Sequence, residues 1–137
     1  MDESLINLVW SRAGRACEYC LMPQVFYPVP FQIDHIIARQ HDGPTTARNL
    51  TLSCLHYNSY KRPNIAGRDK VTNCLTPLFN PRRHRWPRHF RWRGAYIVGR
   101  TPIGRVTVGV LNMNGEFLVR LRAKLIEDEL FPPAAPE

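Results

Sequence analysis

Two short stretches, CEYC at residues 17–20 and CLHY at residues 54–57, are separated by 33 residues. A pair of C-x-x-C motifs at such a distance predicts a zinc site, because structural zinc takes four thiolate or imidazole ligands. The second motif is broken, since Tyr57 stands where a fourth cysteine is expected. The metal-binding framework is therefore only partly intact, and three thiols remain in it: those of Cys17, Cys20 and Cys54.

The length of the chain limits its organisation. A chain of 137 residues predicts one domain, or one small domain with an extension. No apolar run approaches the roughly 20 residues of a membrane helix, and the start of the sequence lacks the pattern of a signal peptide. We therefore expect a cytoplasmic setting without membrane association, where cysteines are more often metal ligands or free thiols than disulfides.

The charge of the chain indicates a polyanionic partner. The net charge is +8 and the calculated isoelectric point is about 9.9. Eighteen of the 19 lysines and arginines precede position 123. A basic domain of this size suits a nucleic acid, although a surplus of charge that serves only solubility gives the same totals.

The first half of the chain predicts a helix, two strands and a second helix. Apolar spacing predicts a helix over residues 4–16, with Asp2 or Ser4 as its cap. Alternating apolar residues predict strands over 31–37 and 49–54. The segment 55–61 is expected to begin a short helix, which Pro63 limits.

The second half of the chain predicts two strands and a helix. Ala95 and Ile97 predict one strand, and the alternation of valines over 106–110 predicts another. Residues 115–130 predict a helix that buries its apolar stripe and exposes Arg120, Arg122 and Lys124; the stripe consists of Phe117, Leu118, Leu121 and Leu125. The expected fold class is therefore α+β.

Four features in the first half converge on one chemistry. Asp34 and His35 end a predicted strand, Asn49 opens the next, and Asn58 and Lys61 lie one turn apart on the following helix. Each feature alone has an ordinary explanation. An Asp-His pair is usually a pair of exposed polar residues, Asn49 follows a turn, and Asn58 near the start of a helix is usually a cap. Together, the Asp34 carboxylate and the Asn58 carbonyl supply the oxygen ligands that Mg²⁺ prefers. His35 is then a candidate general base for water, because an imidazole accepts a proton near neutral pH.

The residues CEYC, IDHII, NLTLSC and YNSYK, in this order, resemble the HNH endonuclease family, whose core is the ββα-metal fold. The resemblance covers about residues 5–65. It implies that His35 is the general base, that Asp34 and Asn58 hold the catalytic divalent ion, and that Asn49 is the central structural asparagine. It gives Lys61 a contact with phosphate, and it implies DNA as the substrate.

The resemblance also implies domain boundaries. An HNH core would span residues 1–65, and a basic and aromatic extension with strands and a C-terminal helix would span 66–130 and pack on that core. Residues 131–137 would form a disordered tail.

The family binds structural zinc through four cysteines, and Tyr57 leaves three alternatives for the fourth position. His56 can turn toward the thiols, Cys74 can return from the extension, or the zinc is absent and Tyr57 packs into the vacated corner. A phenol with a pKa near 10 is a poor zinc ligand at neutral pH. The sequence leaves these alternatives open.

The segment NPRRHRWPRHFRWRG, over residues 80–94, combines arginines with aromatic residues. Arginine suits phosphate geometry, so we expect the aromatic side chains to face the core and the arginines to contact the nucleic-acid backbone. The arginines of this predicted nucleic-acid-binding set are Arg82, Arg83, Arg85, Arg88, Arg91 and Arg93.

The sequence therefore predicts a metal-dependent DNA endonuclease that uses Mg²⁺ or another divalent ion. Zn²⁺ is retained if the three thiolates and one further ligand make a site. The broken second motif favours an alternative, a catalytically silent nucleic-acid-binding module that kept the HNH fold. A zinc-knuckle module for protein interaction is a third reading, and it leaves Asp34, His35 and Asn58 unexplained.

Overall fold

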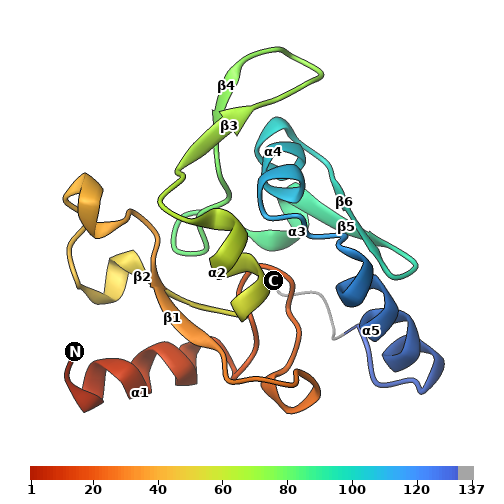
Figure 1. The fold of residues 1–137 in the computed structure, drawn as a ribbon, viewed down its shortest axis with the longest axis horizontal. Helices are drawn as coiled ribbons and strands as arrows, with labels where there is room; N and C mark the ends of the chain where they lie inside the picture. The colour runs from red at the N-terminus through yellow and green to blue at the C-terminus, as the bar shows by residue number, and fades with distance from the viewer. Residues whose placement is uncertain (133–137) are drawn as a thin grey trace. The chain divides into compact units, whose positions relative to one another are not determined.

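The computed structural model describes residues 1–132 and divides into two compact units (Figure 1). Unit 1 consists of residues 1–65 and 80–82, and unit 2 consists of residues 66–79 and the chain from 83 onward. Residues 133–137, which belong to the predicted tail, lie outside the described residues. Phe131, at the start of that predicted tail, is buried and packs edge-on against Trp92.

Unit 1 contains two α-helices, two strands and three short 3-10 helices among its described residues. The α-helices and strands are α1 (Glu3–Arg12), β1 (Gln32–His35), β2 (Leu50–Ser53) and α2 (Leu55–Lys61). The Asp2 carboxylate caps α1 by accepting a hydrogen bond from the Leu5 N–H group at 2.8 Å, as the sequence predicted. The chain turns away from the helix at Gly14, whose φ of +61° favours glycine.

Strands β1 and β2 pair antiparallel, and α2 follows β2 directly. In this register Asp34 lies opposite Thr51, and His35 lies opposite Leu50. Leu50 and Leu52 are fully buried, with Val9 of α1 and Met22 also in the core. The strand-strand-helix order confirms the α+β fold and the order of elements that the sequence predicted for this part of the chain.

Unit 2 is built from two hairpins and three helices within the described residues: β3 (Ala66–Arg68), β4 (Leu75–Pro77), α3 (Trp86–His89), β5 (Phe90–Arg93), β6 (Tyr96–Gly99), α4 (Pro102–Val110) and α5 (Glu116–Glu127). Strands β3 and β4 pair antiparallel, and so do β5 and β6. The strand predicted around Ala95 and Ile97 corresponds to β6.

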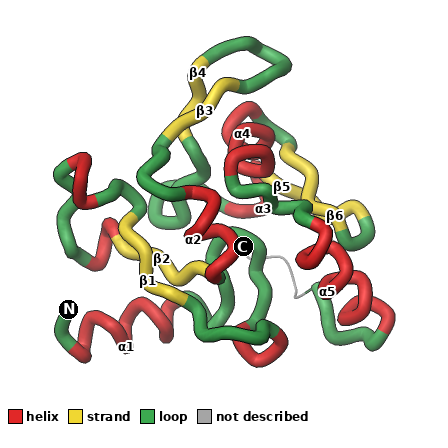
Figure 2. The backbone as a smooth tube through the Cα atoms, viewed as in Figure 1, coloured by secondary structure: helices red, strands yellow, loops and turns green. Residues whose placement is uncertain are grey.

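The second strand predicted in this region, over 106–110, is wrong, because these residues belong to helix α4 (Figure 2). The Thr101 hydroxyl caps α4 by accepting from the Gly104 N–H group at 3.1 Å, and Pro102 occupies the first turn. Val106 and Val110, one helical turn apart, both face Gly67. The cap and this packing outweigh the strand preference of valine.

Helix α5 confirms the predicted helix and most of its faces, since Leu118 and Leu125 are buried while Arg120 and Lys124 are exposed. Two of its predicted positions are wrong. Phe117 is 53% exposed, whereas Arg122 is fully buried. The Arg122 guanidinium donates to the carbonyl oxygens of Ala95 and Met113 at 2.7 and 3.0 Å. Arg122 is therefore an internal anchor of unit 2, since its donors satisfy backbone acceptors that burial would otherwise leave unpaired.

No helix among the described residues is long and apolar enough to cross a membrane.

Candidate functional site

Helix α2 lies against the face of β1 that carries Gln32 and Asp34. The Asn58 Nδ2 group donates to Gln32 Oε1, and the Lys61 ammonium lies 3.6 Å from Asp34 Oδ2. Gln32 and Asp34 share a face because side chains alternate along a strand, and Asn58 and Lys61 share a face because they lie three residues apart on a helix. The structure therefore brings Asp34, Asn58 and Lys61 to one side of β1.

The Asp34 carboxylate is unusually placed for an acid. Its Oδ2 atom is buried and accepts no hydrogen bond, because the Lys61 ammonium lies just beyond hydrogen-bond distance. Burial raises the pKa of Asp34 above its ordinary value, and the charge of Lys61 offsets only part of this effect. A carboxylate oxygen in this state has the capacity to accept a cation or a proton.

Lys61 is almost completely buried, and its ammonium also donates to the His35 carbonyl oxygen at 3.3 Å. Burial lowers the pKa of Lys61, and the neighbouring Asp34 opposes this shift. Both of these contacts face β1. The direct phosphate contact that the sequence predicted for Lys61 stays a prediction.

The His35 side chain points toward the loop that follows β1. Its Nε2 atom lies 2.9 Å from Thr45 Oγ1, which also accepts a hydrogen bond from Arg39 Nη1 at 3.1 Å. Thr45 was missed by the sequence analysis, because a threonine in a turn gives no local signal of its partner. The threonine hydroxyl orients the imidazole ring at the end of β1.

Asn49 holds that same loop closed. Its side chain accepts from the Ile37 N–H group and donates to the carbonyl oxygens of Ile37 and Pro44, all at 2.8–2.9 Å. The loop backbone approaches itself closely at Gly43, where a Cβ atom would lie 1.7 Å from the Ile37 carbonyl oxygen. Asn49 thus bonds to the loop backbone and not to the His35 ring, so it acts by fixing the segment that carries Thr45.

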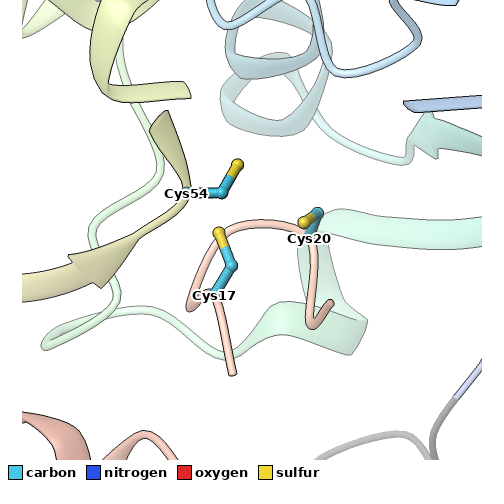
Figure 3. A group of neighbouring side chains, drawn as sticks. All are labelled: Cys17, Cys20 and Cys54. Atoms are coloured by element: carbon cyan, nitrogen blue, oxygen red, sulfur yellow. The ribbon is translucent and has the colours of Figure 1, made fainter. Parts of the chain in front are cut away.

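A second group of side chains is the cysteine cluster, which consists of Cys17, Cys20 and Cys54 (Figure 3). All three are fully buried, and their sulfur atoms lie within 4.8 Å of one another. Cys17 and Cys20 come from the turn after α1, and Cys54 stands at the start of α2. Their thiols form no disulfide, and the structure brings together the three cysteines that the sequence predicted as zinc ligands.

The surroundings of the cysteine cluster favour the thiolate form of Cys20 and the thiol form of Cys17 and Cys54. The Leu21 N–H group donates to the Cys17 carbonyl at 2.8 Å in a tight turn, and the Met22 N–H group bonds to the Cys20 sulfur. Burial raises the pKa of Cys17 and Cys54. Burial also acts on Cys20, but hydrogen bonds from Cys17, Cys54 and Tyr57 outweigh it and hold its pKa well below the ordinary value.

Tyr57 occupies the corner that a fourth thiolate would fill. Its side chain is fully buried, hydrogen-bonds to Cys20 and packs edge-on against Tyr19. Within residues 1–132, neither of the other two candidates joins the cluster. The His56 ring packs on Tyr60 instead, and Cys74 is exposed in unit 2.

Comparison with known proteins gives a match to the segment that contains the residues around Asp34 and the cysteine cluster. Residues 17–63 match the HNH endonuclease family. The match spans about a third of the chain, from Cys17 to just beyond Lys61, and confirms the resemblance seen in the sequence. The HNH domain indicates a nuclease or other nucleic-acid-related function. No curated protein and no solved structure matches the chain significantly.

One acidic residue inside the first cysteine motif organises this HNH domain. The Glu18 carboxylate accepts hydrogen bonds from Thr51 Oγ1 and the Leu52 N–H group at 2.7 and 2.9 Å, and it forms an ion pair with Arg82. Glu18 was missed by the sequence analysis. The sequence assigned Arg82 to the nucleic-acid-binding set. Its guanidinium group is largely buried and paired with Glu18, whereas the other arginines of the set are exposed.

The remaining arginines of the predicted set lie on the surface of unit 2: Arg83, Arg85, Arg88, Arg91 and Arg93. The aromatic residues between them point inward, since Trp86 and Phe90 are buried and Trp92 is half-buried. The segment therefore has the expected arrangement of aromatic residues inside and arginines outside.

Proposed function

We propose that this protein is a metal-dependent endonuclease that hydrolyses DNA phosphodiester bonds. The observation that carries the proposal is that Asp34 lies on the face of β1 against which helix α2 packs, where Asn58 bonds to Gln32 and Lys61 pairs with Asp34. His35 is the last residue of the same strand. The match to the HNH endonuclease family over this same segment supports it.

The residues present fit a hard divalent cation such as Mg²⁺. Asp34 Oδ2 is buried without a hydrogen bond, and within the described chain the Asn58 side-chain oxygen has no hydrogen-bond partner either. Carboxylate and amide oxygens are the donors that such an ion takes from proteins. When bound, the ion polarises the phosphodiester and stabilises the negative charge of the leaving oxygen.

His35 is proposed to activate the attacking water. If the ring donates from Nε2 to Thr45 Oγ1, its Nδ1 atom keeps a lone pair for the proton of a water molecule. The water oxygen would bond to phosphorus while one proton of the water passes to His35. The bond from phosphorus to the 3′ oxygen would break, and the 3′ oxygen would take a proton from solvent to become a hydroxyl group. The resemblance to the family implies 5′-phosphate and 3′-hydroxyl products.

Lys61 and Asn49 are proposed to prepare this site. Lys61 balances the charge of Asp34 in the absence of another cation, since two buried charges of opposite sign stabilise each other. Asn49 fixes the loop that orients the His35 ring.

The cysteine cluster is proposed to hold a structural Zn²⁺. Three buried sulfur atoms within 4.8 Å of one another match the size of a zinc site, in which each Zn–S bond is about 2.3 Å. The N–H groups of Met22 and Tyr57 bond to the cluster sulfurs, as thiolate ligands require. Bound zinc would stabilise the turns that carry Cys17 and Cys20.

A plasmid-nicking assay tests the enzymatic proposal. Supercoiled DNA is incubated with the full chain and Mg²⁺ or Mn²⁺, and the loss of the supercoiled form is measured for the wild type and for His35→Ala, Asp34→Asn and Asn58→Ala. His41→Ala is the matched control, because His41 is an exposed histidine in the same loop. We expect the three site variants to lose nicking and the control to retain it; full nicking by His35→Ala would remove His35 from its role.

A second candidate function is a catalytically silent nucleic-acid-binding module, which the replacement of the fourth cysteine by Tyr57 favours. Such a module would retard DNA in a gel with steep salt dependence but would leave the plasmid intact with every divalent ion. The nicking assay with the wild type separates the two candidates.

A further inference from the structure

We propose that the outer face of the β5–β6 hairpin binds the major groove of duplex DNA. This inference rests on the proposed function and identifies a duplex-contacting surface of that nuclease. The surface, named here the ribbon face, consists of Arg91, Arg93, Tyr96 and Val98.

The register of the hairpin defines the ribbon face. Arg91 lies opposite Val98, and Arg93 lies opposite Tyr96. The alternating residues Phe90 and Ile97 point to the other side and are buried. One side of the ribbon is therefore part of the core of unit 2, and the other side is presented to solvent.

The inner side of the hairpin is firmly anchored. The Asn114 side chain accepts from the Ile97 N–H group and donates to the Ile97 carbonyl at 2.8 and 2.9 Å. Arg122 bonds to Ala95 in the hairpin turn, and a Cβ atom on Gly99 would lie 2.4 Å from the Arg105 backbone nitrogen. A rigid surface binds with a smaller loss of conformational entropy.

These anchors also disfavour a peptide partner. An extended peptide that joins a sheet edge needs free backbone N–H and C=O groups. On β6 the groups of Ile97 are already bonded to Asn114. Strand addition at this position of the β6 edge is therefore blocked, and the inference is based on the side chains of the ribbon face.

The charge of the ribbon face matches a polyanion. No aspartate or glutamate occurs between Asp69 and Glu116, an interval that contains nine lysines and arginines. Arg91 and Arg93 are exposed and make no side-chain hydrogen bond or ion pair within the described residues. Their guanidinium groups are thus free to contact phosphates and the acceptor edge of guanine.

The dimensions favour duplex DNA over a single strand. Residues two apart on a strand are separated by about 6.8 Å, which equals two base-pair steps of about 3.4 Å. A two-stranded ribbon fits the major groove, which is about 12 Å wide. Single-strand binding relies on rows of stacking aromatic residues, but the ribbon face presents only Tyr96, which is 52% exposed, among the described residues.

Fluorescence anisotropy without added divalent ions tests the inference, because binding is then measured separately from cleavage. The double variant Arg91→Ala/Arg93→Ala of the full chain is compared with Arg120→Ala/Lys124→Ala. This control removes the same charge from two exposed sites on α5. The probes are a 30-base-pair duplex and its single strand, each titrated from 50 to 300 mM KCl.

We expect the ribbon variant to bind the duplex about 60-fold more weakly at 0.1 M salt, with a salt slope smaller by about 2, if each arginine neutralises one phosphate. The control variant should change affinity much less. Methylation of guanine N7, which lies in the major groove, should weaken wild-type binding and have no further effect on the ribbon variant.

Equal duplex affinities of the ribbon variant and the control would overturn the inference, and so would preferential binding of the single strand or insensitivity of wild-type binding to N7 methylation. These outcomes are independent of nicking. A wild type that binds through the ribbon face but never cleaves would refute the proposed enzymatic function and support the inference.

Discussion

Replacement of Lys61 by methionine should destabilise the protein strongly, because it leaves the Asp34 carboxylate without a counter-charge. The two charges lie 3.6 Å apart, and their side chains are 3% and 19% exposed. Their attraction is about 5 kcal/mol at an effective dielectric constant of about 20. Removal of one partner of such a pair typically lowers the free energy of unfolding by about 3–5 kcal/mol, and we expect about 3 kcal/mol at pH 7.

The pH dependence of this loss provides a second measurement. Burial already raises the pKa of Asp34, and removal of the Lys61 charge should raise it further. The folded state then binds a proton more tightly than the unfolded state, so stability falls as the pH rises through the raised pKa. The Lys61→Met variant should therefore regain stability in mild acid, and Lys61→Met/Asp34→Asn should lack this dependence.

Chemical denaturation at several pH values, followed by circular dichroism, measures these changes. Lys124→Met is the matched control, because Lys124 is 64% exposed and its i,i+4 pair with Asp128 should contribute less than about 0.5 kcal/mol. A divalent ion that binds Asp34 should stabilise Lys61→Met more than the wild type. The reasoning would be refuted if Lys61→Met were no less stable than the control, or if its loss of stability were the same at pH 5 and pH 8.

Three further predictions concern other contacts of the structure. Thr45→Val should reduce nicking about tenfold and alter its pH profile, because one orienting hydrogen bond to His35 is lost. Thr45→Ser should retain activity. Equal nicking rates for the two variants would contradict this role of Thr45. Tyr57→Cys should increase zinc retention during dialysis against a chelator, as measured by elemental analysis. Tyr57→Phe should lower the free energy of unfolding by about 1 kcal/mol, because the hydrogen bond to Cys20 is lost. Zinc retention by Tyr57→Cys no greater than that of the wild type would count against a zinc site. Arg105 lowers the pKa of Asp69 from its ordinary value of 3.8, so the ion pair stabilises the fold at neutral pH, and this stability is lost as the pH falls below about 4. In an acid titration, Asp69→Asn should start with a lower free energy of unfolding and lose less of it than the wild type. Parallel curves for the two proteins would contradict this pH dependence.

The elements of the first half could be predicted from the sequence because each depends on local patterns. The alternation around Asp34 marks β1, and the acid at position 2 caps α1. The proximity of Asn58 and Lys61 follows from helical periodicity. The catalytic roles of the site residues stay predictions, because geometry alone does not test them.

Much of the second half could not be predicted, because tertiary packing decides between competing local signals. The valines over 106–110 satisfy both a strand alternation and a helical i,i+4 pair. Arg122 resembles any surface arginine in sequence, and only the carbonyls that converge on it explain its burial. Hairpin β3–β4 was not predicted at all.

The supporting residues of the site were missed for a related reason. Thr45 bonds to a residue ten positions earlier, and Glu18 bonds to residues more than thirty positions later. Neither distance corresponds to a helical or strand period. Such partners become visible only when the loop and the cysteine turns have closed.

The ion pair between Glu18 and Arg82 has a practical consequence for dissecting this chain. Residues 80–82 belong to unit 1, although the sequence on either side of them belongs to unit 2. A fragment that stops at residue 65 would contain every side chain proposed for the chemistry, yet its Glu18 would lack the guanidinium that neutralises it. The shortest fragment that keeps unit 1 intact should therefore extend past position 82, even though the family match ends at position 63.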